Sequence, residues 1–286
     1  MKTDARRLAL IVTTLIAVFI LAACNPSSAG APSGTKTSAT ATPVILAAST
    51  MSGPEASATS LAGPTLTTST SGSGGCANAY FPVSSGATWS YASAGSVAGD
   101  YSYNRSLAGI SDTGFIASDE FNSGVTRTTK WGCKDGNLTM LETGSAGGVA
   151  SSTGMKVTID SVTSNGYVIP ATFAAGQTWS ETLELNTTNE AKGKKTGTAQ
   201  SVSQTNCTAG EPESVKVPAG TFDAVKITCH SNQVATVTLT VGGTTGPITT
   251  IQDSTQWYAQ GVGMVQTMNS GDAGNETIQL TSYSIP

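Results

Sequence analysis

The chain has 286 residues, only 11% of them charged, and a formal net charge of −4. Its densest basic cluster, Lys192, Lys194 and Lys195, surrounds a glycine and is interpreted as a solvated turn. The sequence therefore offers no basic surface for nucleic acid, which we do not expect as a partner.

The first 23 residues have the pattern of a bacterial lipoprotein signal peptide. Lys2, Arg6 and Arg7 precede an apolar run of sixteen residues, Leu8 to Ala23, which is shorter than the roughly 18–20 residues that span a bilayer. The run ends in Leu-Ala-Ala-Cys24, the lipobox pattern. We therefore expect cleavage before Cys24 and lipid on its thiol, with an uncleaved N-terminal helix, or plain secretion with a free Cys24, as the alternatives.

Lipid on Cys24 makes a membrane the first predicted partner, since two or three acyl chains attach a protein firmly. The predicted location is extracytoplasmic, on the outer membrane or the outer face of the cell membrane. Asn25 follows the cysteine. In similar bacterial systems an aspartate there often retains the protein at the inner membrane, so Asn25 favours the outer membrane, or the outer face of a single-membrane cell.

Residues 24–75 are predicted to be a disordered linker. From residue 25 onward they consist almost entirely of Ser, Thr, Ala, Gly and Pro, with Lys36 and Glu55 as the only charges and no aromatic residue. Such a segment buries too little apolar surface to offset its chain entropy. A flexible chain of this length has a root-mean-square reach of about 40 Å.

The composition changes at Cys76, and residues 76–286 are predicted to form a single β-rich domain. Apolar and polar residues alternate in several windows, for example Val225, Ile227 and Cys229 against the residues between them. This period of two is typical of antiparallel sheet with one buried face. The predicted fold class is all-β, with roughly a dozen strands in a curved half-barrel or a sandwich.

Two further windows show the same alternation. Val237, Leu239 and Val241 alternate with threonines, and Ile278 and Leu280 alternate with polar residues.

The strongest local prediction is a hairpin between Glu213 and Cys229. Pro218 suits the second position of a type I turn because its φ is already near −65°. Gly220 can take a positive φ and form the bulge that closes a short hairpin.

Five cysteines are present, and four remain if Cys24 carries lipid. An even number in an exported chain indicates two disulfides, for which sequence allows three pairings. We favour Cys76–Cys133 and Cys207–Cys229. The chain has no C-x-x-C pair, so neither a metal site nor any other cofactor is expected.

Catalytic residues are not predicted. His230 is the only histidine and follows Cys229 on the face expected to be polar, and no G-x-S-x-G sequence occurs. The candidate carboxylate pairs are Asp119 with Glu120 and Glu181 with Glu184. In a strand the members of each pair point to opposite faces, so neither pair converges on one site. Glu181 should share its face with Trp179.

The tryptophans divide into two groups. Trp89 and Trp179 each follow a similar turn, in Gly-Ala-Thr-Trp-Ser and Gly-Gln-Thr-Trp-Ser, and both are predicted to fill the core. Trp131, Trp257 and Tyr258 are the candidate ligand-lining residues. Trp257 and Tyr258 are adjacent, so they should face opposite sides of a strand.

Three blocks together carry a family resemblance: residues 80–91 (YFPVSSGATWSY), 217–222 (VPAGTF) and 257–265 (WYAQGVGMV). In this order they resemble a group of bacterial exported lipoproteins that includes TapB-like domains of unknown function. The resemblance implies a β-rich domain, in the form of a curved half-barrel similar to lipoprotein-carrier folds. It implies no catalytic residues.

The predicted function is non-enzymatic binding of a cell-envelope component or a lipid-like ligand, which could be an envelope lipid, a glycan or a protein. The first alternative is a structural or adhesive surface module with a solid core and no pocket. The second is an envelope hydrolase based on His230 or on a carboxylate pair.

Overall fold

A computed structural model describes residues 74–97, 99–143, 155–272 and 274–286. The predicted signal peptide, Cys24 and nearly all of the predicted linker lie outside these ranges. Within them, no helix has both the length and the apolar character needed to cross a membrane.

Twelve antiparallel strands form one sheet in the order β5-β4-β3-β2-β1-β12-β11-β10-β9-β8-β7-β6. Each strand pairs with its neighbours in sequence, except that β12 returns beside β1 and no pairing joins β5 to β6 along their length. A single turn of 3-10 helix, η1, precedes the sheet. The bounds are η1 (Gly74–Cys76), β1 (Thr88–Ala94), β2 (Ser102–Ser111), β3 (Gly114–Phe121), β4 (Thr126–Lys134), β5 (Asn137–Thr143), β6 (Met155–Gly166), β7 (Thr178–Ala191), β8 (Lys194–Val217), β9 (Gly220–Leu239), β10 (Gly243–Ala259), β11 (Gly263–Gly271) and β12 (Glu276–Ser284).

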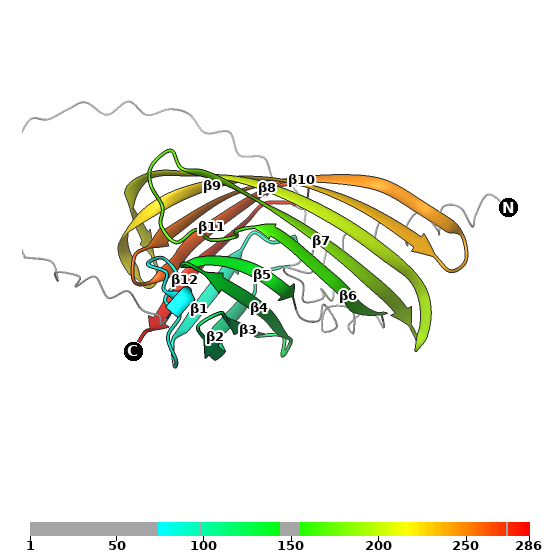
Figure 1. Ribbon diagram of the computed structural model, residues 1–286, viewed down its shortest axis with the longest axis horizontal. Coiled ribbons are helices and arrows are strands. Elements are labelled where there is room, and N and C mark those ends of the chain that lie inside the picture. The colour runs from blue at the N-terminus through cyan, green and yellow to red at the C-terminus, as the bar shows by residue number, and fades with distance from the viewer. Residues whose placement is uncertain (1–73, 98, 144–154, 273) are drawn as a thin grey trace, which may run out of the picture.

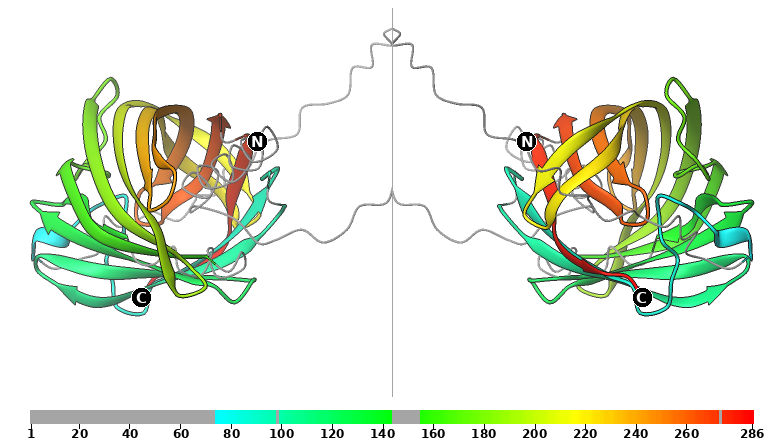
Figure 2. Two further views of the ribbon diagram at one scale, coloured as in Figure 1. Left: turned by 90° about the vertical axis from the view of Figure 1, so that its right-hand side faces the viewer. Right: turned by 90° about the vertical axis from the view of Figure 1, so that its left-hand side faces the viewer.

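The sheet curves until it almost closes on itself (Figures 1 and 2). Strands β7 to β10 are long and arch beyond the shorter strands β1 to β5. The two free edges meet near one end, where the Leu138 amide donates to the Ile169 carbonyl at 2.8 Å. The all-β, half-barrel prediction is confirmed, and the single continuous sheet rules out the sandwich alternative.

The predicted hairpin is present, with one correction. Strand β8 ends at Val217, β9 begins at Gly220, and these two residues pair across a two-residue turn. Gly220 has the expected positive φ of 143°. The bulge lies elsewhere, between Ala209 and Pro212, where it bends a long strand of a strongly curved sheet.

The predicted alternation also holds along β9. Val225, Ile227 and Cys229 are buried, whereas His230 is exposed. The exception is Val241, which is 86% exposed. Its position lies past the end of β9, in the turn to β10, so no sheet face is available to bury it.

The segment between η1 and β1, residues 77–87, closes one end of the sheet and links three of its connections. Asn78 is buried and its side-chain amide donates to the carbonyls of Gly136 and Pro170, at 2.8 and 2.9 Å. The Gly261 amide donates to the Ala79 carbonyl at 2.8 Å. The segment therefore ties the β4–β5 turn and the β6–β7 connection to the β10–β11 turn.

Aromatic side chains pack this end of the interior. Phe81, from the same segment, lies with its ring centroid 5.5 Å from that of Phe115 and 6.0 Å from that of Trp131. A second cluster surrounds Trp89, whose indole nitrogen donates to the Val262 carbonyl at 2.6 Å. The predicted core position of Trp89 is therefore observed, with 2% of the residue exposed.

Two disulfides are present, Cys76–Cys133 and Cys207–Cys229. This is the pairing that we favoured from the sequence. Cys76–Cys133 attaches the start of the domain to β4, and Cys207–Cys229 joins directly paired residues of β8 and β9.

Candidate functional site

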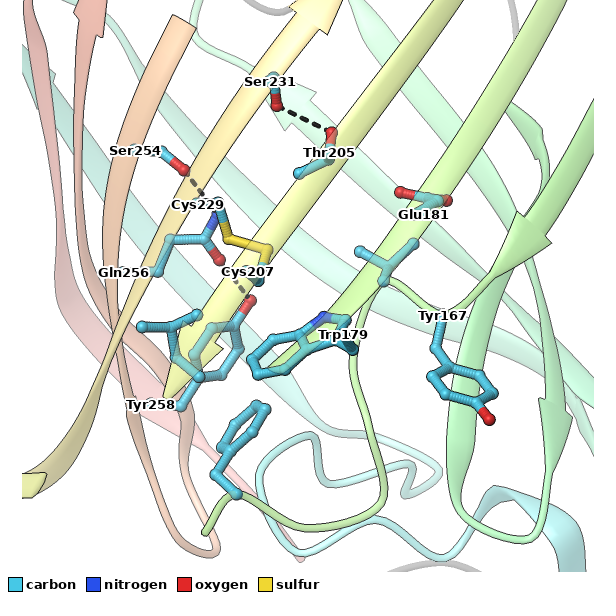
Figure 3. A pocket seen from close by; sticks show the side chains of 13 residues that line it. Tyr167, Trp179, Glu181, Thr205, Cys207, Cys229, Ser231, Ser254, Gln256 and Tyr258 are labelled. Carbon is cyan, nitrogen blue, oxygen red and sulfur yellow. Dashed lines mark hydrogen bonds between the residues drawn. A yellow bond between two sulfur atoms is a disulfide. The ribbon is translucent and has the colours of Figure 1, made fainter. Parts of the chain in front are cut away.

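A pocket of about 210 Å³ opens on the concave face of the sheet, between β7–β10 and the β6–β7 connection (Figure 3). Its lining residues come from five segments of the chain that the sheet brings together. They are Tyr167, Val168, Phe173, Trp179, Glu181, Thr205, Cys207, Ile227, Cys229, Ser231, Ser254, Gln256 and Tyr258.

Strand register places these side chains in rows. Trp179 pairs with Cys207, Cys207 with Cys229, and Cys229 with Ser254. Because side chains two residues apart share a face, the next row along β7, β8 and β9 also lines the pocket. The disulfide thus forms part of the pocket wall and covalently holds its two central strands together.

One end of the pocket is aromatic. The Phe173 ring stacks on Trp179 at 5.6 Å between centroids and is tilted against Tyr258 at 5.5 Å. The buried indole nitrogen of Trp179 has no hydrogen-bond partner. The Tyr258 hydroxyl donates to the Gln256 side-chain oxygen at 3.0 Å, and burial raises the pKa of Tyr258 to about 12 against an opposing effect of the Arg105 charge.

The other end is polar. The hydroxyls of Thr205 and Ser231 are hydrogen-bonded at 2.8 Å, and the Ser164 hydroxyl donates to the Glu181 carboxylate at 3.2 Å. Burial raises the pKa of Glu181, and the Ser164 hydrogen bond only partly opposes this. Of the described residues that line the pocket, Glu181 is the only charged one.

The candidate ligand-lining residues have different locations. Tyr258 lines the pocket. Trp257 points to the opposite face, where its indole nitrogen donates to the Glu213 carboxylate and Lys226 lies 5.8 Å from its ring centroid. Trp131 stacks on Phe115 in the core and does not border the pocket.

Trp179, which we predicted to be a core residue, lies instead at the pocket. The usable signal in the sequence was the alternation that puts Trp179 and Glu181 on one strand face. An aromatic ring beside a carboxylate on a partly apolar face indicates a binding surface better than an isolated tryptophan does.

Asp119 belongs to a buried charge cluster on the opposite half of the sheet. Arg105 and Arg127 each approach its carboxylate to 2.7 Å, and the Asp119 side chain is 3% exposed. Burial alone would raise the pKa of Asp119, but the two guanidinium groups outweigh it and lower the pKa to about 2. Glu120 is exposed, so the two carboxylates diverge as expected.

His230 lies on the outer face, where Nδ1 is 2.7 Å from the Asp253 carboxylate. More than half of each of these two side chains is exposed. Within the described residues, no group of three His, Cys, Asp or Glu side chains is arranged to hold a metal ion.

Comparison with known proteins identifies a family and two structures of low similarity. No curated protein matches the chain. A "putative exported protein with YmcC-like fold" from Bacteroides fragilis NCTC 9343 is 18% identical, with a TM-score of 0.45, over 73% of this chain and 100% of that one. A "putative lipoprotein" from Parabacteroides distasonis ATCC 8503 is 16% identical, with a TM-score of 0.43, over 72% of this chain and 99% of that one. The DUF3108-like family model matches residues 116–284, which include the second and third resemblance blocks, and the chain therefore belongs to the DUF3108-like family.

Proposed function

We propose that this protein is an extracytoplasmic lipoprotein, held to a membrane by lipid on Cys24, that binds a cell-envelope component in its concave pocket. The observation that carries the proposal is the pocket itself. It combines an aromatic end with a polar end, and its walls are fixed by a disulfide and by paired strands. Ligand sites commonly combine apolar walls with a few placed polar groups in this way.

The location is supported by the lipobox at Cys24 and by the disulfides. Both disulfides lie in the domain that follows the predicted tether. Such bonds form and persist in oxidising compartments outside the cytoplasm.

Binding without chemistry is supported by the positions of the titratable groups. Glycoside hydrolysis ordinarily requires two carboxyl groups on either side of the scissile bond, and Glu181 is the only carboxylate among the described lining residues. Asp119 is held by two arginines, and His230 lies on the outer face. Neither Asp119 nor His230 is placed to assist a reaction at the pocket.

The size of the pocket bears on the carrier version of this function. At about 210 Å³ it is smaller than the roughly 300–1,000 Å³ typical of sites that enclose drug-sized ligands. It therefore favours a small ligand, or one end of a larger one, over an enclosed acyl chain. The TapB-like resemblance does not bear on this choice of ligand.

The test compares two tryptophan substitutions at neighbouring positions. Thr205→Trp fills the pocket, whereas Asn206→Trp adds the same ring to an exposed position on the other face of β8. The lipidated protein and both variants are purified from the native envelope in mild detergent. Bound material is then analysed by mass spectrometry after solvent extraction, and by sugar analysis after acid hydrolysis.

We expect an envelope component to be retained by the native protein and by Asn206→Trp and lost from Thr205→Trp. Equal retention by both variants, or no retention by the native protein, would contradict the proposal and favour a structural module. Urea unfolding of both variants shows whether the fold has survived.

A further inference from the structure

We infer that the pocket binds a single hydroxylated ring, as in one neutral or amino-sugar unit of an envelope glycan, and discriminates against anionic ligands. This inference rests on the proposed function, because it specifies the ligand class of the same pocket. It is carried by three features of the lining: its charge, its unpaired donor and its aromatic walls.

The charge of the lining disfavours anions. Of the described lining residues only Glu181 is charged, and no lysine or arginine joins it. Arg105 and Arg127 do not line the pocket, and both are paired with Asp119. A carboxylate or phosphate brought beside Glu181 would meet a like charge in a partly desolvated site, which is unfavourable.

The hydrogen-bonding groups select for hydroxyls. The buried indole N–H of Trp179 lacks an acceptor, which is unusual because buried polar groups are nearly always paired. Glu181, two residues along the same strand face, accepts a hydrogen bond from Ser164 at 3.2 Å, and its carboxylate can accept others. In Figure 3 the indole nitrogen lies on the edge of the ring that is turned toward Glu181.

A hydroxyl group can both donate and accept, so adjacent hydroxyls of one ring could satisfy Glu181 and Trp179 together. An ammonium group can only donate, and a carbonyl group can only accept. The Thr205 and Ser231 hydroxyls, which are bonded to each other at 2.8 Å, add further donors and acceptors at the same end of the pocket.

The aromatic walls and the volume favour a ring. Phe173, Trp179 and Tyr258 present faces and edges at one end of the pocket, and Tyr167, which also lines it, is 44% exposed. The face of an aromatic ring is electron-rich. It therefore attracts the polarised C–H groups of a sugar while the sugar hydroxyls point elsewhere. A volume of about 210 Å³ accommodates one such ring.

The experiment uses three pyranoses of equal ring size and different charge: glucose, glucosamine and glucuronate. Saturation-transfer NMR at pH 7 on the whole mature chain from residue 24 detects the weak binding expected of single sugars. We expect glucose and glucosamine to bind, and glucuronate to bind about tenfold more weakly, the size of effect that one like-charge contact produces in a partly solvated site.

Two substitutions locate the effect. Glu181→Gln should remove the discrimination against glucuronate. Glu184→Gln is the matched control, because Glu184 lies on the other face of the same strand and accepts a hydrogen bond from Gln200 at 2.8 Å. Trp179→Phe, which removes the indole N–H, should weaken all three sugars equally.

Glucuronate binding as tight as glucose binding, or discrimination that survives Glu181→Gln, would overturn the inference. If none of the sugars binds while Thr205→Trp still displaces an envelope lipid, the inference fails but the proposed function stands. If none of the sugars binds and Thr205→Trp displaces nothing, both fail.

Discussion

Replacing Asp119 with asparagine tests whether the buried charge cluster of β2, β3 and β4 stabilises the fold. Arg105 donates to both carboxylate oxygens of Asp119, at 2.7 and 2.9 Å, and Arg127 donates to Oδ2 at 2.7 Å. The cluster has two positive charges and one negative charge. Loss of the carboxylate leaves two guanidinium groups close together and largely buried.

The expected magnitude follows from the pKa of Asp119, which falls from 3.8 to about 2 on folding. This difference corresponds to about 2.4 kcal/mol of stabilisation at neutral pH. Because the folded-state pKa is the lower one, the stabilisation is present above pH 3.8 and is lost as the pH falls through about 2. The unpaired arginines add to the loss in the variant, giving about 3–5 kcal/mol in total at pH 7.

The assay is urea unfolding of the native chain and Asp119→Asn, followed by tryptophan fluorescence with both disulfides intact. We expect the difference in unfolding free energy between the native chain and Asp119→Asn to become about 2 kcal/mol smaller at pH 2 than at pH 5. Glu120→Gln, at the exposed neighbouring position, should change stability by no more than about 0.5 kcal/mol. A difference for Asp119→Asn that is as large at pH 2 as at pH 5 would refute the reasoning.

Three further predictions concern the pocket and its surroundings. Replacing Cys207 and Cys229 together by alanine opens a loop with a sequence separation of 22 residues. Urea unfolding should then show a free energy of unfolding that is lower by about 3 kcal/mol. An unchanged free energy would show that strand pairing alone holds the pocket wall. Tyr258→Phe should leave the 295 nm absorbance titration unchanged below about pH 11 and remove one ionisation above it, since the pKa of Tyr258 is about 12; loss of a step near pH 10 would contradict this. Gly176→Ala, at a φ of +78° with open space around it, should lower the free energy of unfolding by about 1 kcal/mol. Gly166→Ala should lower it clearly more, because its new Cβ would lie 2.1 Å from a backbone oxygen. Equal thermal stabilities of the two variants would contradict this prediction.

Much of the fold could be predicted because its signals are local. The period of two along Val225, Ile227 and Cys229 identifies a strand and its buried face. The Val217–Gly220 turn depends on residues that are adjacent in sequence. The cysteine pairing followed from the same information, since a hairpin that turns at Pro218 brings Cys207 and Cys229 together.

The site could not be predicted in the same way, because it depends on register between distant strands. Arg105 and Arg127 reach Asp119 only because all three residues pair side by side across β2, β3 and β4. Nothing local marks Trp179 as a pocket residue and Trp131 as a core residue. The difference arises because Trp131 faces Phe81 and Phe115, whereas Trp179 faces the more open part of the concave surface.

The position of Cys76 also has a mechanical consequence. A pull transmitted through the chain that precedes Gly74 reaches Cys76 within two residues and passes through the disulfide to Cys133 in β4. The force enters the sheet covalently before it reaches Asn78 or Phe81. The hydrogen bonds and ring contacts of the end-closing segment therefore bear little of the load, and a membrane-tethered domain could be pulled from its amino-terminal side without this segment being drawn out of the interior.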